Sequence, residues 1–241
     1  PLGFIVLAVM YFFLGLGFYQ IFGAGAPYME YVVFFPVQVL FFVIPVITMR
    51  LFSDERRTRT DQVLFTAPVK LINIVMGKFL ASFTLYVMGF LPTIIYQIIV
   101  SSFLKSADSS ASVHVYYYIY ALIGVLLFGA ALIAIGMFIS SLSESPIISI
   151  IFTLITNLFI MSAGSFASLI TVPSKTDTVF QAVVAFLLKV LSKFLNGMNF
   201  TQVLDSFNNQ AFAVKDVIYF ISITIAFIFL TERSLEKRRW S

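Results

Sequence analysis

The sequence predicts an all-α, polytopic membrane protein with six transmembrane helices, and three observations lead to this fold class. Hydrophobic residues make up 60% of the 241 residues and charged residues only 11%. The mean hydropathy is +1.01. A soluble domain is about half apolar and about a quarter charged, so this composition excludes one. The length accommodates about six spans of roughly 20 residues with their loops, which predicts a single transmembrane domain over residues 1–241.

Six apolar runs, separated by polar or proline- and glycine-containing segments, account for the predicted spans. In chain order they cover about 2–22, 32–51, 72–102, 115–140, 147–169 and 217–231. Pro36 and Pro45 should bend the second span. The sixth run is short, so Lys215 and Asp216 are expected at the membrane interface, with their neighbours partly buried.

The long stretch between the last two spans contains an amphipathic segment at about 176–195. Its few polar side chains recur at helical spacing; they are Gln181, Lys189, Ser192 and Lys193. A helix of this kind lies in the membrane interface or dips into the bilayer, and this one should end near Gly197. We therefore expect an external interfacial or re-entrant helix before the last span.

Basic residues are distributed unevenly, and this sets the orientation. Ten of the fifteen lie in residues 50–78 or in the tail after residue 232. Six spans place both segments on one side of the membrane, and the excess of Lys and Arg marks that side as cytoplasmic. Because the basic residues flank spans and form no single patch, no nucleic-acid partner is predicted.

The residues that the sequence lacks exclude several kinds of chemistry. There is no cysteine, which excludes disulfides, thiolate metal sites and thiol catalysis. The single histidine, His114, reads as an interfacial aromatic residue and argues against a transition-metal site. No phosphate loop, dinucleotide fingerprint or HExxH motif occurs, so no catalytic residue and no metal ligand are predicted. No span carries the acid–base relay of a proton-coupled transporter.

Residues 50–81 are the most polar part of the chain and hold six of the fifteen basic residues, so they must lie in water. A short helix is predicted over 53–67. Ser53 can cap it, Asp54 and Glu55 suit the positive end of its dipole, and Pro68 stops it. Composition alone favours a positive-inside loop with a solvated helical turn.

The same stretch resembles the signature of ABC-transporter permeases of the type-2 exporter family. In that family the second span is followed by a glutamate, basic residues, a threonine–acid pair, a leucine and a proline, and then a glycine–lysine pair entering the third span. The matching positions are Glu55, Arg57, Thr60, Asp61, Leu64, Pro68, Gly77 and Lys78. Arg59 stands where relatives often carry glycine, and Asp61 stands where they usually carry glutamate.

The resemblance implies that residues 53–67 form a cytoplasmic coupling helix, which docks in a groove of a separate ATPase subunit. The implied ATPase-coupling residues are Glu55, Arg56, Arg57, Thr60, Asp61, Leu64 and Pro68. ATP and Mg would be bound by that subunit, and this chain would hold no cofactor. A second permease subunit, identical or similar, would complete the path across the lipid bilayer.

Within the family, the chain most resembles the gliding-motility-like branch. The resemblance rests on SDERR together with TAPV, and on the tail LTERSLEKRRW. That branch often works with an extracytoplasmic auxiliary protein. The resemblance also implies a multi-pass protein of the cytoplasmic membrane of a prokaryote.

Two further polar residues are candidates for function. Glu144 is the one charge in the turn SSLSESP, where relatives often form a second contact with the ATPase; a simple turn, with Ser145 and Pro146 starting the next helix, is the alternative. Asn157, near the middle of the fifth span, is a candidate for the substrate path because polar groups at membrane depth are costly. A hydrogen bond between helices is the alternative.

The predicted function is thus a permease subunit of an ATP-driven exporter that is not itself an enzyme. Two alternatives remain. A mechanical transmitter would use the same ATPase coupling to act on an external partner without moving a molecule across the membrane. A membrane scaffold would have no ATPase at all.

Overall fold

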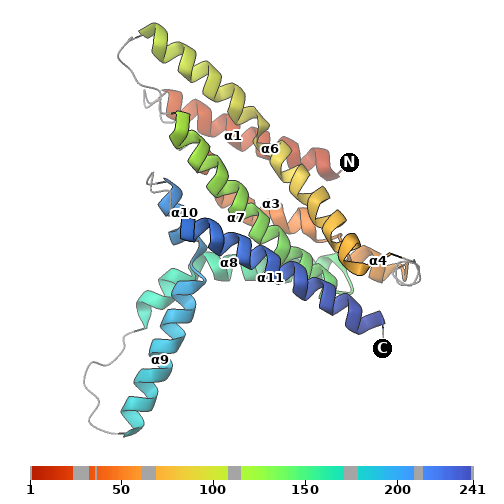
Figure 1. The fold of residues 1–241 in the computed structure, drawn as a ribbon. Helices are drawn as coiled ribbons and strands as arrows, with labels where there is room; N and C mark the ends of the chain where they lie inside the picture. The colour runs from red at the N-terminus through yellow and green to blue at the C-terminus, as the bar shows by residue number, and fades with distance from the viewer. Residues whose placement is uncertain are drawn as a thin grey trace.

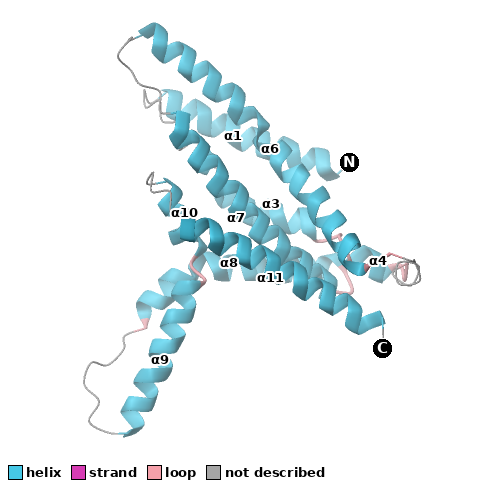
Figure 2. Ribbon diagram, in the orientation of Figure 1, coloured by secondary structure: helices cyan, strands magenta, loops and turns pink. Residues whose placement is uncertain are grey.

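The computed structural model describes residues 2–23, 33–35, 37–60, 69–107, 115–170, 179–208 and 214–239. Within these ranges every regular element is a helix (Figure 2). The helices are α1 (Leu2–Gly23), α3 (Val37–Thr48), α4 (Ser53–Arg57), α6 (Leu71–Ala107), α7 (Val115–Leu142), α8 (Pro146–Leu169), α9 (Val179–Gly197), α10 (Phe200–Asn208) and α11 (Val214–Arg239).

Six helical stretches among the described residues are long and apolar enough to cross a membrane. They are α1, the stretch from α3 through α4, α6, α7, α8 and α11. The predicted all-α, six-span fold class is therefore confirmed.

Helix α7 is the centre of the bundle. Of its most apolar window 67% is buried inside the protein, against 22% for α1 and for α11. It packs against α3, α6, α8, α10 and α11 (Figure 1). Small residues permit this close approach: Gly129 accommodates the ring of Tyr86 from α6, and Gly136 accommodates Thr48 at the end of α3.

One end of the bundle gathers the start of α1, all of α4 and the end of α11 (Figure 1). The end of α6 and the start of α7 lie at the opposite end. The two basic segments identified in the sequence thus share one end of the molecule, as an even number of crossings requires.

The last span differs most from its prediction. Helix α11 runs from Val214 to Arg239, well beyond the predicted 217–231. The apolar pattern ends where the charged tail begins, but the helix continues because Glu, Lys and Arg are good helix formers. Arg233 and Glu236 support it with an i,i+3 ion pair of 2.5 Å. The helix is therefore 26 residues long and extends beyond the predicted span at both ends.

Helix α9 covers most of the predicted amphipathic segment and ends at Gly197. It leaves the bundle beside α8 (Figure 1). The polar stretch after it forms a further helix, α10, which the sequence pattern did not indicate. Phe200, Leu204 and Phe207 of α10 are buried, and the helix packs on α7 and α8.

Candidate functional site

The start of α4 is held by a residue from α7. Phe52 occupies the N-cap position, and Ser53 is already the first helical residue. The Ser53 hydroxyl donates to the Met49 carbonyl and caps nothing. Instead the Ser140 hydroxyl oxygen accepts the backbone N–H groups of Phe52 and Ser53, at 3.1 and 3.3 Å. The amides that a helix leaves unpaired at its start are thus satisfied from a position 88 residues away.

Helix α4 ends at Arg57, ten residues before the predicted end of the segment 53–67. Thr58 and Thr60 close the turn with backbone N–H donations to Asp54 and Glu55, at 3.0 and 2.9 Å. Arg59 has a φ of 56°, in the left-handed region that glycine enters without steric cost. This conformation explains why the helix does not continue through Arg59.

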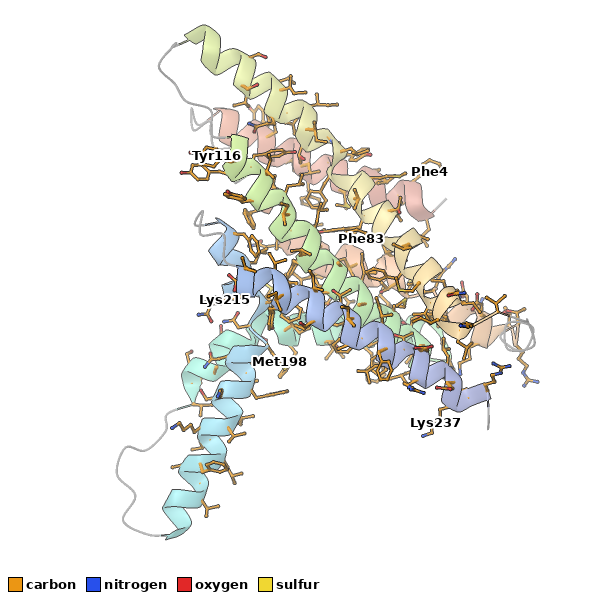
Figure 3. The ribbon with its side chains drawn as sticks, viewed as in Figure 1. Phe4, Phe83, Tyr116, Met198, Lys215 and Lys237 are labelled. Carbon is orange, nitrogen blue, oxygen red and sulfur yellow. The ribbon has the colours of Figure 1, made fainter. Side chains whose placement is uncertain are left out.

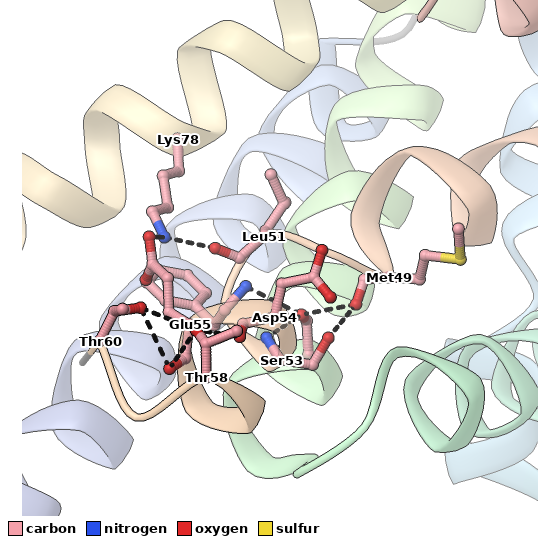
Figure 4. Close-up of polar contacts among 10 residues, drawn as sticks. Met49, Leu51, Ser53, Asp54, Glu55, Thr58, Thr60 and Lys78 are labelled. Carbon is pink, nitrogen blue, oxygen red and sulfur yellow. Dashed lines mark hydrogen bonds and ion pairs between the residues drawn. The ribbon is translucent and has the colours of Figure 1, made fainter. Parts of the chain in front are cut away.

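Lys78, in the second turn of α6, ties α6 to α4. Its Nζ lies 2.5 Å from the Glu55 carboxylate and donates to the Leu51 carbonyl (Figure 4). It also lies 4.1 Å from the centre of the Phe52 ring. The Lys78 and Glu55 side chains are 20% and 32% exposed. Glu55 therefore faces the spans.

Arg56 ties α4 to the turn between α7 and α8. One guanidinium nitrogen donates to the Leu142 carbonyl and the other to the Glu144 carboxylate, each at 2.6 Å. The structure thus brings together two candidate regions that the sequence treated as separate contacts. The Leu142 carbonyl is one of the last in α7, where a cation is also favoured by the helix dipole.

The outward face of this segment consists of its last residues. Arg57, Thr58, Arg59 and Thr60 are all exposed, and the two threonine hydroxyls lie 2.9 Å apart. Of the predicted coupling residues, Glu55 and Arg56 point toward the protein, whereas Arg57 and Thr60 face solvent. Asp61, Leu64 and Pro68 lie outside the described residues, as does His114.

Lys78 belongs to the family pattern found in the sequence, but that pattern predicted no role for its side chain. No feature of the sequence pointed to Ser140. A signal for Lys78 was present, because a lysine nearly two turns inside a predicted span needs a partner. Ser140 had no such signal: a serine at the end of an apolar helix is commonplace.

Asn157 is fully buried between helices of the same chain. Its side-chain N–H₂ donates to the Phe41 carbonyl of α3 at 3.3 Å. With Ser149 and Thr153 it forms a buried stripe along α8, the helix that packs on α3 and α7. This geometry favours the hydrogen bond between helices over a position on an open path.

The comparison with protein families decides the assignment. The family described as "ABC-2 family transporter protein" matches residues 26–232, from before α3 to well inside α11. The chain belongs to the ABC-2 transporter family. It is accordingly a transmembrane permease subunit of an ABC transporter, a component that is not itself the ATPase. Members of this family normally work with an ABC ATPase subunit and a second permease. Searches of the curated proteins and of the solved structures found no match.

Proposed function

We propose that this ABC-2 permease is half of an ATP-driven exporter, in which α4 transmits the closing of separate ATPase subunits to the membrane spans. One observation carries the proposal. Helix α4 is fastened to α6 through Lys78 and Glu55, and to the α7–α8 turn through Arg56 and Glu144, while Arg57 and Thr60 stay exposed. A push on the outward face would therefore reach several spans at once.

In this proposal two permease subunits form the path, and each ATPase binds ATP with Mg and docks against α4. The exposed residues Arg57 and Thr60, together with Asp61, Leu64 and Pro68, make the docking surface. Glu55, Arg56 and Glu144 hold α4 in position beneath it. ATPase closure then shifts the permease from an inward-facing to an outward-facing state.

The basic end of the bundle is the cytoplasmic end, by the excess of Lys and Arg there, and the membrane is the cytoplasmic membrane of a prokaryote. The branch is the gliding-motility-like one, with an extracytoplasmic auxiliary partner. Asn157 would reach the substrate path only in a state that separates α8 from α3.

The mechanical transmitter is the second candidate, and one observation favours it. Helix α9 projects from the bundle (Figure 1) and exposes large apolar side chains, among them Phe186, Leu187 and Phe194. Such a surface would suit an external partner that receives work through α8. Transport of a substrate into sealed vesicles would exclude this alternative.

The test separates positioning residues from contact residues. The permease is co-expressed with its genomic neighbours, and both co-elution of an ATPase and ATP hydrolysis are measured. Arg57→Ala should weaken co-elution and leave the melting temperature of the permease unchanged. Glu55→Ala should lower the melting temperature and uncouple hydrolysis.

The double variant Glu55→Lys with Lys78→Glu restores the ion pair with reversed charges, and it should regain part of the coupling that each single variant loses. If no ATPase co-elutes with the native protein and none of these variants changes hydrolysis, the coupling proposal fails and the scaffold takes its place.

A further inference from the structure

An apolar groove of about 600 Å³ is lined by α7, α8, α11 and the junction of α9 with α10. Helix α11 lines it with Tyr219, Ile223 and Phe227, which follow one another at intervals of one turn. At a rise of 1.5 Å per residue this stripe is about 12 Å long. One leaflet contributes about half of a hydrocarbon core of roughly 30 Å, so the groove has the length of an acyl chain within a single leaflet.

A polar contact joins two residues at the Tyr219 end of the groove. The Tyr219 hydroxyl donates to the Gly197 carbonyl at 2.5 Å, which joins α11 to the end of α9. The Tyr219 ring also packs edge-on against Phe200, with ring centres 5.7 Å apart. Met198, at the bend between α9 and α10, lines the same end (Figure 3).

Two exposed lysines each lie one helical turn from a residue of this contact. Lys193 lies one turn before Gly197 on α9. Lys215, labelled in Figure 3, lies one turn before Tyr219 at the start of α11. Both are exposed, and neither belongs to an ion pair within the described ranges. Asp216, the acid next to Lys215, is only 5% exposed and faces the protein. The two lysines thus form a positive rim beside the apolar groove.

We propose that this groove binds an acyl chain of an anionic phospholipid, whose phosphate lies against Lys193 and Lys215. Both parts of such a lipid find a suitable partner. The apolar acyl chain fills the groove, and the negative headgroup meets two lysines at the interface, where lysine side chains extend toward headgroups. Lys215 lies in the first turn of α11, at the opposite end of that helix from its basic tail (Figure 3), so the headgroup belongs to the external leaflet. The bound lipid fastens α9 to α11 independently of any ATPase.

The test is native mass spectrometry of the full chain, purified in a neutral detergent and offered equal amounts of phosphatidylglycerol and phosphatidylcholine. The native protein should retain phosphatidylglycerol preferentially. Lys193→Ala and Lys215→Ala should each reduce that preference about fivefold, since a lysine near an anionic surface contributes on the order of 1 kcal/mol. The double variant should bind both lipids alike.

Ile223→Trp fills the groove and should abolish retention of either lipid. Two matched controls should behave like the native protein. Lys237→Ala removes an exposed lysine at the other end of α11, and Ile5→Trp fills the separate groove of about 550 Å³ between α1 and α3. The proposal is overturned if the native protein retains both lipids equally, or if the lysine double variant keeps the native preference. Arginine at both positions should preserve the preference, which guards against a misfolded alanine variant.

Discussion

Arg56 shows how one side chain can join two distant segments at the α4 end of this permease. Its planar guanidinium reaches a helix-terminal carbonyl and a carboxylate at once, which are 86 and 88 residues away in the sequence. A lysine offers a single point charge in place of the two-pronged donor. The contribution of Arg56 therefore depends on the planar shape of its side chain as well as on its charge.

The first prediction concerns the relative weight of these two bonds. Arg56→Ala should lower the free energy of unfolding by about 1–2 kcal/mol, because it removes two charge-assisted hydrogen bonds. Glu144→Ala should cost less than about 1 kcal/mol, because Glu144 is 76% exposed and exposed ion pairs contribute little. Thermal unfolding in one detergent, at two salt concentrations, measures both. Equal losses for the two variants would contradict the arrangement seen here.

The second prediction concerns the backbone at Arg59. Arg59→Gly should keep or slightly raise the stability of the permease, because the left-handed conformation costs a non-glycine residue about 1 kcal/mol. Arg59→Val should lower the stability of the permease, because a β-branched residue avoids the left-handed region. Arg57→Val is the matched control, since Arg57 is equally exposed and lies in α4 with helical geometry. A Val variant at 59 as stable as the Gly variant would refute the assigned conformation.

At the scale of elements, α7 owes its central place to residues that are small where neighbouring helices approach. Tyr86 of α6 lies against Gly129, and its hydroxyl donates to the Val125 carbonyl at 2.7 Å. A fully buried tyrosine needs such a partner. Packing and polar satisfaction therefore coincide at one contact between α6 and α7.

The third prediction follows from this contact. Gly129→Ala places a methyl group against the Tyr86 ring and should cost about 1–3 kcal/mol through overpacking. Gly77→Ala, in α6, meets nothing within 4 Å and should be neutral or stabilising, because alanine is the better helix former. Melting temperatures of the two variants in the same detergent provide the comparison. If Tyr86→Phe leaves Gly129→Ala as destabilising as before, the ring and not the hydroxyl is responsible.

At the scale of the whole molecule, charge separates the two ends of the bundle. Helix α4 and the end of α11 bring their basic residues to one end, and Lys215 lies at the opposite end of α11 (Figure 3). The positive-inside rule assigns the first end to the cytoplasm. Every functional proposal above depends on this assignment.

The fourth prediction tests the orientation directly. The chain has no cysteine, so the single substitutions Lys215→Cys and Lys237→Cys each introduce a unique thiol, at opposite ends of α11. A membrane-impermeant maleimide added to intact cells should label the cysteine at 215 and not the one at 237. Permeabilised cells should show labelling of both, and the cysteine-free parent of neither. The reverse pattern in intact cells would invert the topology.

Much of this architecture was predictable because its signals are local. Six apolar runs predicted the number of spans, and Ser145 followed by Pro146 predicted the start of α8, with Ser145 as N-cap. The end of α11 was not predictable from hydropathy, because hydropathy reports the depth of a segment in the membrane and not its helicity. Helix α10 was missed because its short apolar stripe lies within a polar stretch.

The candidate site was predictable as a segment but not as an arrangement. The family pattern placed Glu55 and Arg56 in it, yet both side chains turn toward the spans and leave Arg57 and Thr60 outside. Which face of a five-residue helix looks inward is decided by the partners around it. Those partners come from two other parts of the chain: Lys78 from α6, and Ser140 and Glu144 from the end of α7 and the turn after it.

The sequence by itself determined the class of the protein, its six spans, its charge asymmetry and the segment that marks its family. Each of these depends on composition or on residues within a turn or two of one another. Only the tertiary structure decided that Lys78 holds Glu55, that Ser140 takes the place of a cap for α4, and that Arg56 meets Glu144. Such contacts depend on the rotation and register of each helix against its neighbours. These are fixed only when side chains that are far apart in the sequence pack together.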